Sequence, residues 1–175
     1  GYLGKRHSRV SNLPDFNGEY PVVAMADEML VEGEGQLKGF VTVAGNPVLS
    51  TPNGEKLDEA LSQLEFMVSL DYFVTETSRH ANIILPPVSP LERDHYDITF
   101  NGFAVHNVAK YSPALFDKTD DTKHDWEIYL GLADRLDKDA PEATQKERAA
   151  TKAFGPKFLL EQGLKYGPHK EVTFE

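Results

Sequence analysis

The chain has 175 residues, of which 40% are hydrophobic and 26% are charged, and these proportions are ordinary for a globular domain. Its formal net charge of −10 argues against nucleic acid or an anionic membrane surface as the main partner, because both are negatively charged. The sequence contains no cysteine, which excludes a cysteine nucleophile, a thiolate metal site, an iron–sulfur cluster and a disulfide within these residues. No apolar run approaches the ~20 residues of a membrane span, so membrane insertion is not expected.

The first forty residues predict an extended segment, a helix and a strand. Residues 1–20 are polar and read as an extended lead-in. Residues 21–31 carry apolar side chains at helical spacing after a proline suited to the first helical position, and glycines at 33 and 35 end this predicted helix. The near-continuous apolar run at 39–43 is typical of a strand in a sheet that is covered on both faces.

The next forty residues repeat the alternation of helix and strand. A turn at 50–54 precedes apolar residues at helical spacing, which predict a helix from about 56 to 64. The strand 66–71 follows it. Thr75 is expected to cap a short helix through Ala81, with Ser78 and Arg79 exposed. Residues 82–85 then form a short apolar strand that two prolines close.

The second half of the chain is less regular. Residues 86–122 have no sustained period, which predicts a long structured loop with a few extended pairs. Helical spacing returns at 125–136, residues 137–150 are charged and expected to be solvated, and 153–166 predict one more helix. We therefore expect a Rossmann-like domain at 1–138 and, at 139–175, a charged linker with a C-terminal helical tail.

The alternation of strands and helices predicts the α/β class: a three-layer, mainly parallel sheet with flanking helices, Rossmann-like, with a long loop and C-terminal helices. Ligands bind such sheets at the carboxyl ends of the strands. Asn46 and Asp71 follow neighbouring strands and are therefore the first candidates for ligand contacts.

Each candidate also has a purely structural interpretation. Asn46 offers both a donor and an acceptor, but Asn-Pro is also a common turn. The carboxylate of Asp71 can accept two parallel hydrogen bonds from the edge of guanine, or it can cap the helix that follows. Arg93 lies in the polar cluster 92–97 of the long loop, where its planar guanidinium could bind a phosphate or form a surface ion pair.

Other common kinds of site find no support in the sequence. The six histidines are scattered and none forms an i, i+4 pair, so a metal site built by this chain is not expected. There is no Gly-x-Ser-x-Gly motif, and Gly33-x-Gly35 is not a dinucleotide fingerprint because no strand precedes it. The residues alone therefore indicate a small-molecule-binding α/β domain without a visible catalytic group.

Four stretches of the sequence resemble one family. They read AGNPVLSTPNG at 44–54, VSLDYFVTETSRHANIILPP at 68–87, LERDHY at 91–96 and AVHNVAKYSP at 104–113, and Asp125-Trp126 continues the match. Together they resemble the third domain of molybdopterin oxidoreductases, the dimethyl sulfoxide reductase family. The resemblance covers roughly residues 10–136, and its block from 44 to 96 is the most specific part.

The resemblance implies a cofactor and contacts to it. Enzymes of this family bind molybdenum or tungsten between two pterin guanine dinucleotides, each held by a Rossmann-like domain. By resemblance, Asn46 contacts one dinucleotide arm, Leu70 and Asp71 meet its guanosine end, and Arg93 and Asp125 add polar contacts. The pterin and the metal bring the redox chemistry, so these residues have binding roles and none is expected to be catalytic.

The chain is also expected to be a piece of a longer protein. It begins without an initiator Met or a signal-peptide pattern, and the iron–sulfur segment, the metal-ligating region and the C-terminal barrel of the family have no counterpart in it. Its expected partners are the other domains of the parent chain and electron-transfer subunits. The compartment, cytoplasm or periplasm of a bacterial or archaeal parent, stays open, and so does the substrate.

Two other interpretations remain. One is a non-catalytic relative, since the large subunit of respiratory NADH dehydrogenase resembles this family yet lacks molybdenum. The other is a free-standing nucleotide-binding or interaction domain whose long loop, 86–122, is the contact surface.

Overall fold

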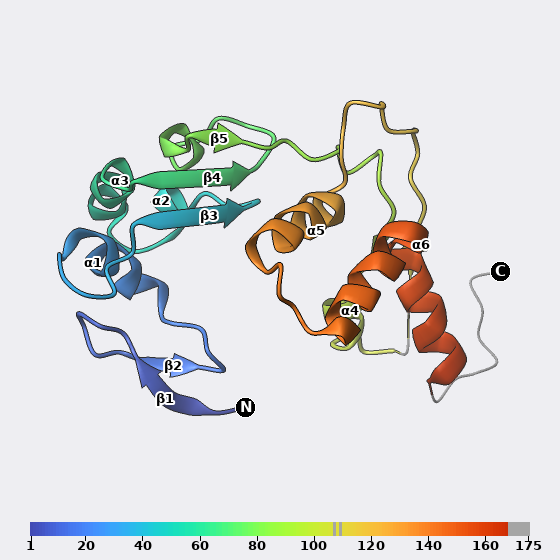
Figure 1. Cartoon of the computed structure of the whole chain (residues 1–175), viewed down its shortest axis with the longest axis horizontal. Coiled ribbons are helices and arrows are strands. Elements are labelled where there is room, and N and C mark those ends of the chain that lie inside the picture. Colours follow the sequence, from blue (N-terminus) through green and yellow to red (C-terminus); the bar gives the residue numbers. More distant parts are fainter. Residues whose placement is uncertain (107, 109, 168–175) are drawn as a thin grey trace. The chain divides into compact units, whose positions relative to one another are not determined.

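The computed structural model describes residues 1–106, 108 and 110–167, and it divides into two compact units, Gly1–Pro86 and Pro87–Glu175 (Figure 1). This division lies at the two prolines that end the sheet. The boundary expected near residue 138, between the Rossmann-like domain and the C-terminal tail, stays a prediction. Residues 168–175 of the expected C-terminal tail, and residues 107 and 109 of the fourth resembling stretch, lie outside the described residues.

A three-stranded parallel sheet forms the centre of the first unit. Its strands are β3 (Gly39–Val43), β4 (Phe66–Leu70) and β5 (Ile83–Ile84), in that spatial order (Figure 1). Val41 lies opposite Val68, which lies opposite Ile83. The helix α3 (Gly54–Ser62) makes the connection from β3 to β4. The predicted α/β, Rossmann-like class with a parallel sheet and flanking helices is therefore confirmed.

The hydrophobic core lies between one face of the sheet and two helices. Met67 of β4 is fully buried against α3 and against α1 (Met25–Leu30), which follows the short 3-10 helix η1 (Val22–Ala24). The residues in this core are Ala26, Met29, Leu57, Ala60, Leu61 and Met67. The helical spacing that predicted both helices thus marks the faces that the helices bury.

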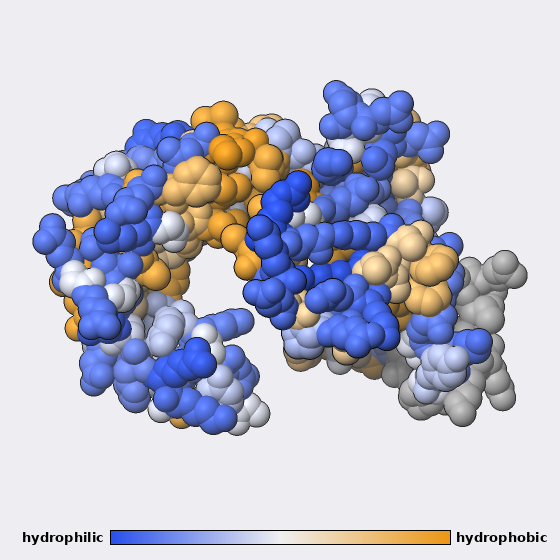
Figure 2. All heavy atoms as spheres, in the orientation of Figure 1, coloured by the Kyte–Doolittle hydropathy of each residue, from blue (hydrophilic) through white to orange (hydrophobic). Residues whose placement is uncertain are grey.

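The other face of the sheet is only partly covered. Val41, Val43 and Ile83 are 53%, 48% and 45% exposed, and Figure 2 shows hydrophobic residues gathered on the surface over this sheet. The expectation that strand 39–43 is covered on both faces is therefore wrong for the described residues. An apolar run indicates which side chains favour burial. It does not indicate whether other helices or strands of the chain cover them.

The lead-in is a hairpin rather than a single extended segment. Strand β1 (Leu3–His7) pairs antiparallel with β2 (Pro14–Phe16). The fully buried carboxylate of Asp15 accepts backbone N–H bonds from Arg6 and Gly18, each at 2.9 Å. These bonds compensate for the burial of a charge and hold the turn, and the polar composition of the segment gave no sign of them.

Two short helices flank the strand ends. Residues after Asn46 form α2 (Pro47–Ser50), a short helix that was not predicted, and η2 (Ser78–His80) occupies part of the short helix expected from Thr75 to Ala81. The hydroxyl of Thr75 accepts the N–H of Ser78 at 3.1 Å, but the N-cap of η2 is Thr77, so Thr75 does not occupy the predicted cap position. Arg79 is exposed as expected, whereas Ser78 is fully buried, so its predicted exposure is wrong.

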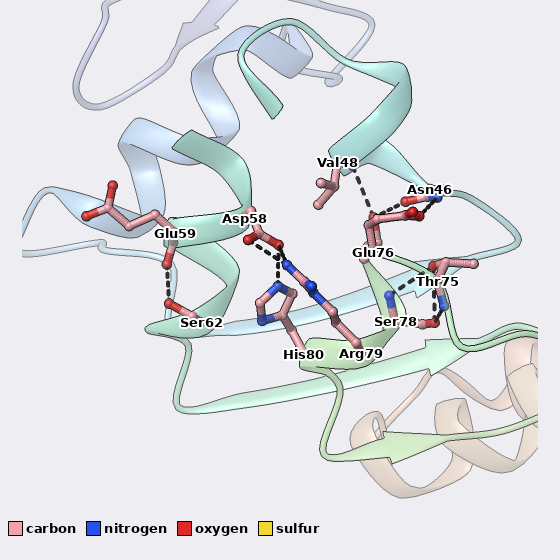
Figure 3. Close-up of polar contacts among 11 residues, drawn as sticks. Asn46, Val48, Asp58, Glu59, Ser62, Thr75, Glu76, Ser78, Arg79 and His80 are labelled. Carbon is pink, nitrogen blue, oxygen red and sulfur yellow. Dashed lines mark hydrogen bonds and ion pairs between the residues drawn. The ribbon is translucent and has the colours of Figure 1, made fainter. Parts of the chain in front are cut away.

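An ion-pair cluster ties η2 to α3. Both oxygens of Asp58 accept from Arg79 Nη2 at 2.7 Å, and Asp58 Oδ1 lies 2.6 Å from His80 Nε2 (Figure 3). Hydrogen bonds from His80 and then from Arg79 lower the pKa of Asp58 below its ordinary value of 3.8. The cluster therefore stabilises the contact between η2 and α3 in its ionised form.

The second unit contains two longer helices and one short strand pair. Strand β6 (His95–Tyr96) pairs antiparallel with β7 (Tyr111–Ser112), and α4 (Ile98–Asn101) lies between them in sequence, which agrees with a structured loop containing extended pairs. Helix α5 (Asp125–Leu136) has the predicted bounds. Helix α6 (Glu142–Tyr166) begins earlier than the predicted 153–166 and is interrupted at Gly155, which has a φ of 72°. Among the described helices, none combines the length and the apolar character that a bilayer crossing requires.

Truncation of the core should destabilise the chain far more than truncation at the surface. We expect Leu61→Ala, at a side chain only 2% exposed, to lower the free energy of unfolding by about 2–5 kcal/mol, because it leaves a cavity beneath the sheet. Leu49→Ala, at a side chain 67% exposed, should change it by no more than about 0.5 kcal/mol. Urea denaturation followed by circular dichroism measures both, and equal effects would contradict the described core.

The Asp58 cluster should make stability depend on pH. Because the pKa of Asp58 is lowered in the folded state, its stabilisation is present above the ordinary value of 3.8 and is lost as the pH falls through the folded value. We expect wild type to have a higher Tm than Asp58→Asn at about pH 6, and this difference to narrow at about pH 3. The exposed control Asp139→Asn should show no such narrowing. A constant difference between wild type and Asp58→Asn would refute the role of the cluster.

Candidate functional site

The carboxyl ends of β3 and β4 lie at the same edge of the sheet. The N–H of Ala44 donates to the carbonyl of Leu70 at 2.9 Å, which extends the ladder by one bond beyond β3. Ala44 then adopts a φ of 47°, in the left-handed region, and the chain turns away through Gly45. Asn46 and Asp71 therefore start from adjoining strand ends, as the alternation of strands and helices predicted.

The side chain of Asn46 is engaged on both sides of its amide. Its Oδ1 accepts a hydrogen bond from Thr77 Oγ1 at 2.7 Å, and its Nδ2 donates to Glu76 Oε2 at 2.7 Å (Figure 3). The same hydroxyl of Thr77 accepts the N–H of Val48 at 3.0 Å. The hydrogen bond from Asn46 lowers the pKa of Glu76. Asn46 thus links the end of β3 to the loop after β4, beyond what a simple Asn-Pro turn requires.

Asp71 opens the loop that follows β4. Its Oδ1 accepts the N–H of Tyr72 at 2.7 Å and, more weakly, that of Phe73 at 3.3 Å. The carboxylate therefore shapes the turn and makes no capping bond to η2. Among the described residues, its other oxygen, Oδ2, accepts no hydrogen bond. Phe73 is 71% exposed, and its ring lies edge-on to that of Tyr72 with centroids 6.3 Å apart, so an exposed aromatic surface follows the carboxylate.

Leu70 contributes to this edge differently from the two polar residues. Its side chain is buried in the sheet, and its carbonyl accepts the N–H of Ala44. Any contact that Leu70 makes with a ligand must therefore come from its backbone. Its expected contact with a guanosine stays a prediction.

The other two candidates belong to the second unit and pair with each other. Arg93 Nη1 forms an ion pair with Asp125 Oδ2, and the two side chains are 31% and 33% exposed. Asp125 is the first residue of α5, whose start is fixed by a bond from His124 N–H to Glu127 Oε2 at 2.7 Å. The structure thus brings Arg93 and Asp125 together across 32 positions of sequence and leaves both partly accessible.

Glu76 and Thr77 also belong to this site, although the sequence analysis did not predict them. They lie in a polar run, 75–77, that follows a strand end as Asn46 does. This position after a strand could have identified them as candidate site residues. No group of three or more histidine, aspartate or glutamate side chains in the described part of the chain has the geometry to hold a metal ion.

Comparison with known proteins shows which family this chain is similar to. The family model described as molybdopterin oxidoreductase matches residues 15–135. An assimilatory nitrate reductase catalytic subunit of Bacillus subtilis (strain 168) is 33% identical over 106 residues, which are 60% of this chain and 14% of the relative. An F420-dependent formate dehydrogenase 1 subunit alpha of Methanococcus maripaludis is 29% identical over 109 residues, 62% of this chain and 15% of the relative.

A third relative gives the same result over a longer stretch. The probable oxidoreductase YyaE of Bacillus subtilis (strain 168) is 25% identical over 134 residues, 77% of this chain and 20% of the relative. The chain therefore spans between 14% and 20% of the length of these relatives. The match of the family model includes both strand ends and the pair Arg93–Asp125, and it covers most of the chain. The chain belongs to the molybdopterin oxidoreductase family.

Proposed function

We propose that this chain forms one guanine-dinucleotide-binding part of a larger molybdenum- or tungsten-dependent oxidoreductase and that it is inactive by itself. The observation that carries the proposal is the pairing of the family match with a Rossmann-like sheet whose polar residues, Asn46 and Asp71, start from adjoining strand ends. The small share of each relative that the chain covers supports a part rather than a whole enzyme.

The groups at the strand ends suit a guanosine. Guanine presents a ring N–H and an exocyclic amine side by side, and a carboxylate accepts such a pair well. Asp71 Oδ1 accepts the N–H of Tyr72 at 2.7 Å and that of Phe73 at 3.3 Å, while its Oδ2 accepts no hydrogen bond within the described residues. The exposed ring of Phe73 adds an apolar surface next to this carboxylate. This acceptor and this apolar surface are thus of the kind that would bind a guanosine.

Arg93 and Asp125 suit the more polar part of a dinucleotide. The guanidinium of Arg93 uses Nη1 for Asp125, and its planar shape allows further donors to bind a phosphate. Asp125 holds the guanidinium in place at the start of α5. When bound, the pterin and its metal supply the redox chemistry, while these residues bind and orient the dinucleotide.

The range of relatives also supports a role in holding the cofactor. A nitrate reductase and a formate dehydrogenase match this chain over similar lengths, although their names give different substrates. A segment that is similar in both enzymes is better suited to binding a cofactor that they share than to selecting the substrate. In this proposal the metal ligands lie elsewhere in the larger polypeptide, and the other domains and electron-transfer subunits are the partners.

The first test uses the full-length polypeptide. We expect a purified, properly matured preparation to contain molybdenum or tungsten, together with guanine nucleotide released on acid hydrolysis. Elemental analysis and chromatography of the hydrolysate measure the two. A folded preparation with neither would refute the proposal and favour a non-catalytic relative or a nucleotide-binding interaction domain.

The second test concerns Asp71. Asp71→Asn keeps an acceptor for the N–H of Tyr72 but removes the charge that strengthens hydrogen bonds to guanine, each worth about 1.5–3 kcal/mol. We expect the affinity of the full-length protein for the dinucleotide to fall by about tenfold or more, measured as guanine nucleotide retained after dialysis. Asp117→Asn makes the same charge change at an exposed position and should retain the wild-type amount. If both variants retained equal amounts of guanine nucleotide, Asp71 would not be a binding residue.

A further inference from the structure

We propose that Thr77 and Glu76 are positioning residues that fix the side-chain amide of Asn46, so that Asn46 presents an N–H donor to the dinucleotide. This inference rests on the proposed function and adds two residues to its site, together with the polarity of one contact. The ligand group that it assigns to Asn46 is an acceptor oxygen or ring nitrogen of the cofactor.

Thr77 determines which end of the amide faces the interior. Its side chain is 0% exposed, and its oxygen accepts the N–H of Val48 at 3.0 Å. A hydroxyl has only one proton to donate, and the proton of Thr77 goes to Asn46 at 2.7 Å. Thr77 therefore favours the carbonyl oxygen as the amide atom next to it, because a nitrogen there would leave the proton of this buried hydroxyl without that acceptor.

Glu76 independently requires the same orientation. An ionised carboxylate only accepts hydrogen bonds, so the amide atom 2.7 Å from Glu76 Oε2 must be the nitrogen of Asn46. Rotating the amide by half a turn would set its carbonyl against the carboxylate and leave two acceptors facing each other. Two different partners, one at each polar atom of the amide, thus favour the same orientation of Asn46.

This orientation decides what remains for a ligand. The carbonyl of Asn46 lies on the buried side, next to Thr77, while its nitrogen lies on the exposed side, next to Glu76. Glu76 takes one hydrogen of the nitrogen, and the second hydrogen is left to donate. A ligand at the strand ends therefore meets an N–H group.

The loop that carries these two residues is itself held in place. Ser78 is fully buried, and its oxygen accepts the N–H of Thr75 at 2.7 Å and donates to the carbonyl of Phe73 at 2.8 Å. In return, Thr75 Oγ1 accepts the N–H of Ser78 at 3.1 Å. The backbone at Glu76 and Thr77 is thus fixed from both ends, which makes the orientation of Asn46 independent of a bound ligand.

The first experiment observes Asn46 directly in the chain without cofactor. Thr77→Val removes the hydroxyl at nearly constant volume, Thr77→Ser restores it, and Thr42→Val is the matched control. Thr42 is also a buried threonine of this sheet, and its hydroxyl lies 3.2 Å from that of Ser69, so the control loses a comparable bond without touching Asn46. We expect hydrogen exchange of the Asn46 side-chain NH2 with water, measured by NMR, to be about tenfold faster in Thr77→Val alone.

The second experiment measures the cofactor in the full-length protein carrying the same three substitutions. We expect Thr77→Val to retain at least about fivefold less guanine nucleotide after dialysis than Thr42→Val, and Thr77→Ser to retain nearly the wild-type amount. A purely structural role for Thr77 would instead lower thermal stability in both valine variants and leave their nucleotide retention equal.

The outcomes separate the inference from the proposed function. If wild type retains guanine nucleotide and Thr77→Val retains as much as Thr42→Val, the positioning role is refuted and the proposed function stands. If the NMR signals of Asn46 do not respond to Thr77→Val, the orientation itself is refuted. If wild type contains no guanine nucleotide, the proposed function fails, and the donor role assigned to Asn46 fails with it, whatever the NMR result.

Discussion

The parallel ladder between β3 and β4 is the contact on which the rest of the first unit depends. It aligns the strands from Gly39 opposite Phe66 to Val43 opposite Leu70, and the N–H of Ala44 adds a final bond to Leu70. A slip of one residue would turn the side chains of a strand to the opposite face and take Met67 out of the core. The same slip would separate the starts of the two loops, so register sets the core and the candidate site together.

Burial in this unit is less complete on one face of the sheet than on the other. Met67 and the helices α1 and α3 close one face, whereas Val41, Val43 and Ile83 of the other face stay about half exposed. Burying apolar surface contributes about 25 cal/mol per Å², so an uncovered face forgoes that contribution. Local polar contacts add to the apolar core, such as those of the buried Asp15 in the hairpin and of Asp58 beside Arg79 and His80.

The polar side chains at the strand ends of the candidate site are held by contacts within the chain itself. Asn46 forms hydrogen bonds with both Glu76 and Thr77. One oxygen of Asp71 accepts a backbone N–H of the turn that follows it. A side chain already held in one rotamer loses little conformational entropy when it binds. This arrangement agrees with a part whose task is to hold a large cofactor in a fixed place, while the chemistry occurs on the cofactor.

The sequence by itself determined several of the regular elements and the polar residues at the ends of β3 and β4. The apolar run at 39–43 and the helical spacing at 125–136 match β3 and α5, because period and polarity are local properties that survive in any fold of this class. The resemblance carried by residues 44–96 determined the family in the same way, since it depends on residue identities alone.

Only the tertiary structure decided which side chains meet. Asn46 and Thr77 are 31 positions apart, and Arg93 and Asp125 are 32 apart, so no local pattern relates them. Ser78 was expected at the surface and Asp15 lies in a polar segment, yet both are fully buried, and hydrogen bonds in the folded chain compensate for their lost hydration. Partners of this kind exist only once the strands have paired, and that is the physical reason why the sequence could point to Asn46 but not to the residues that orient it.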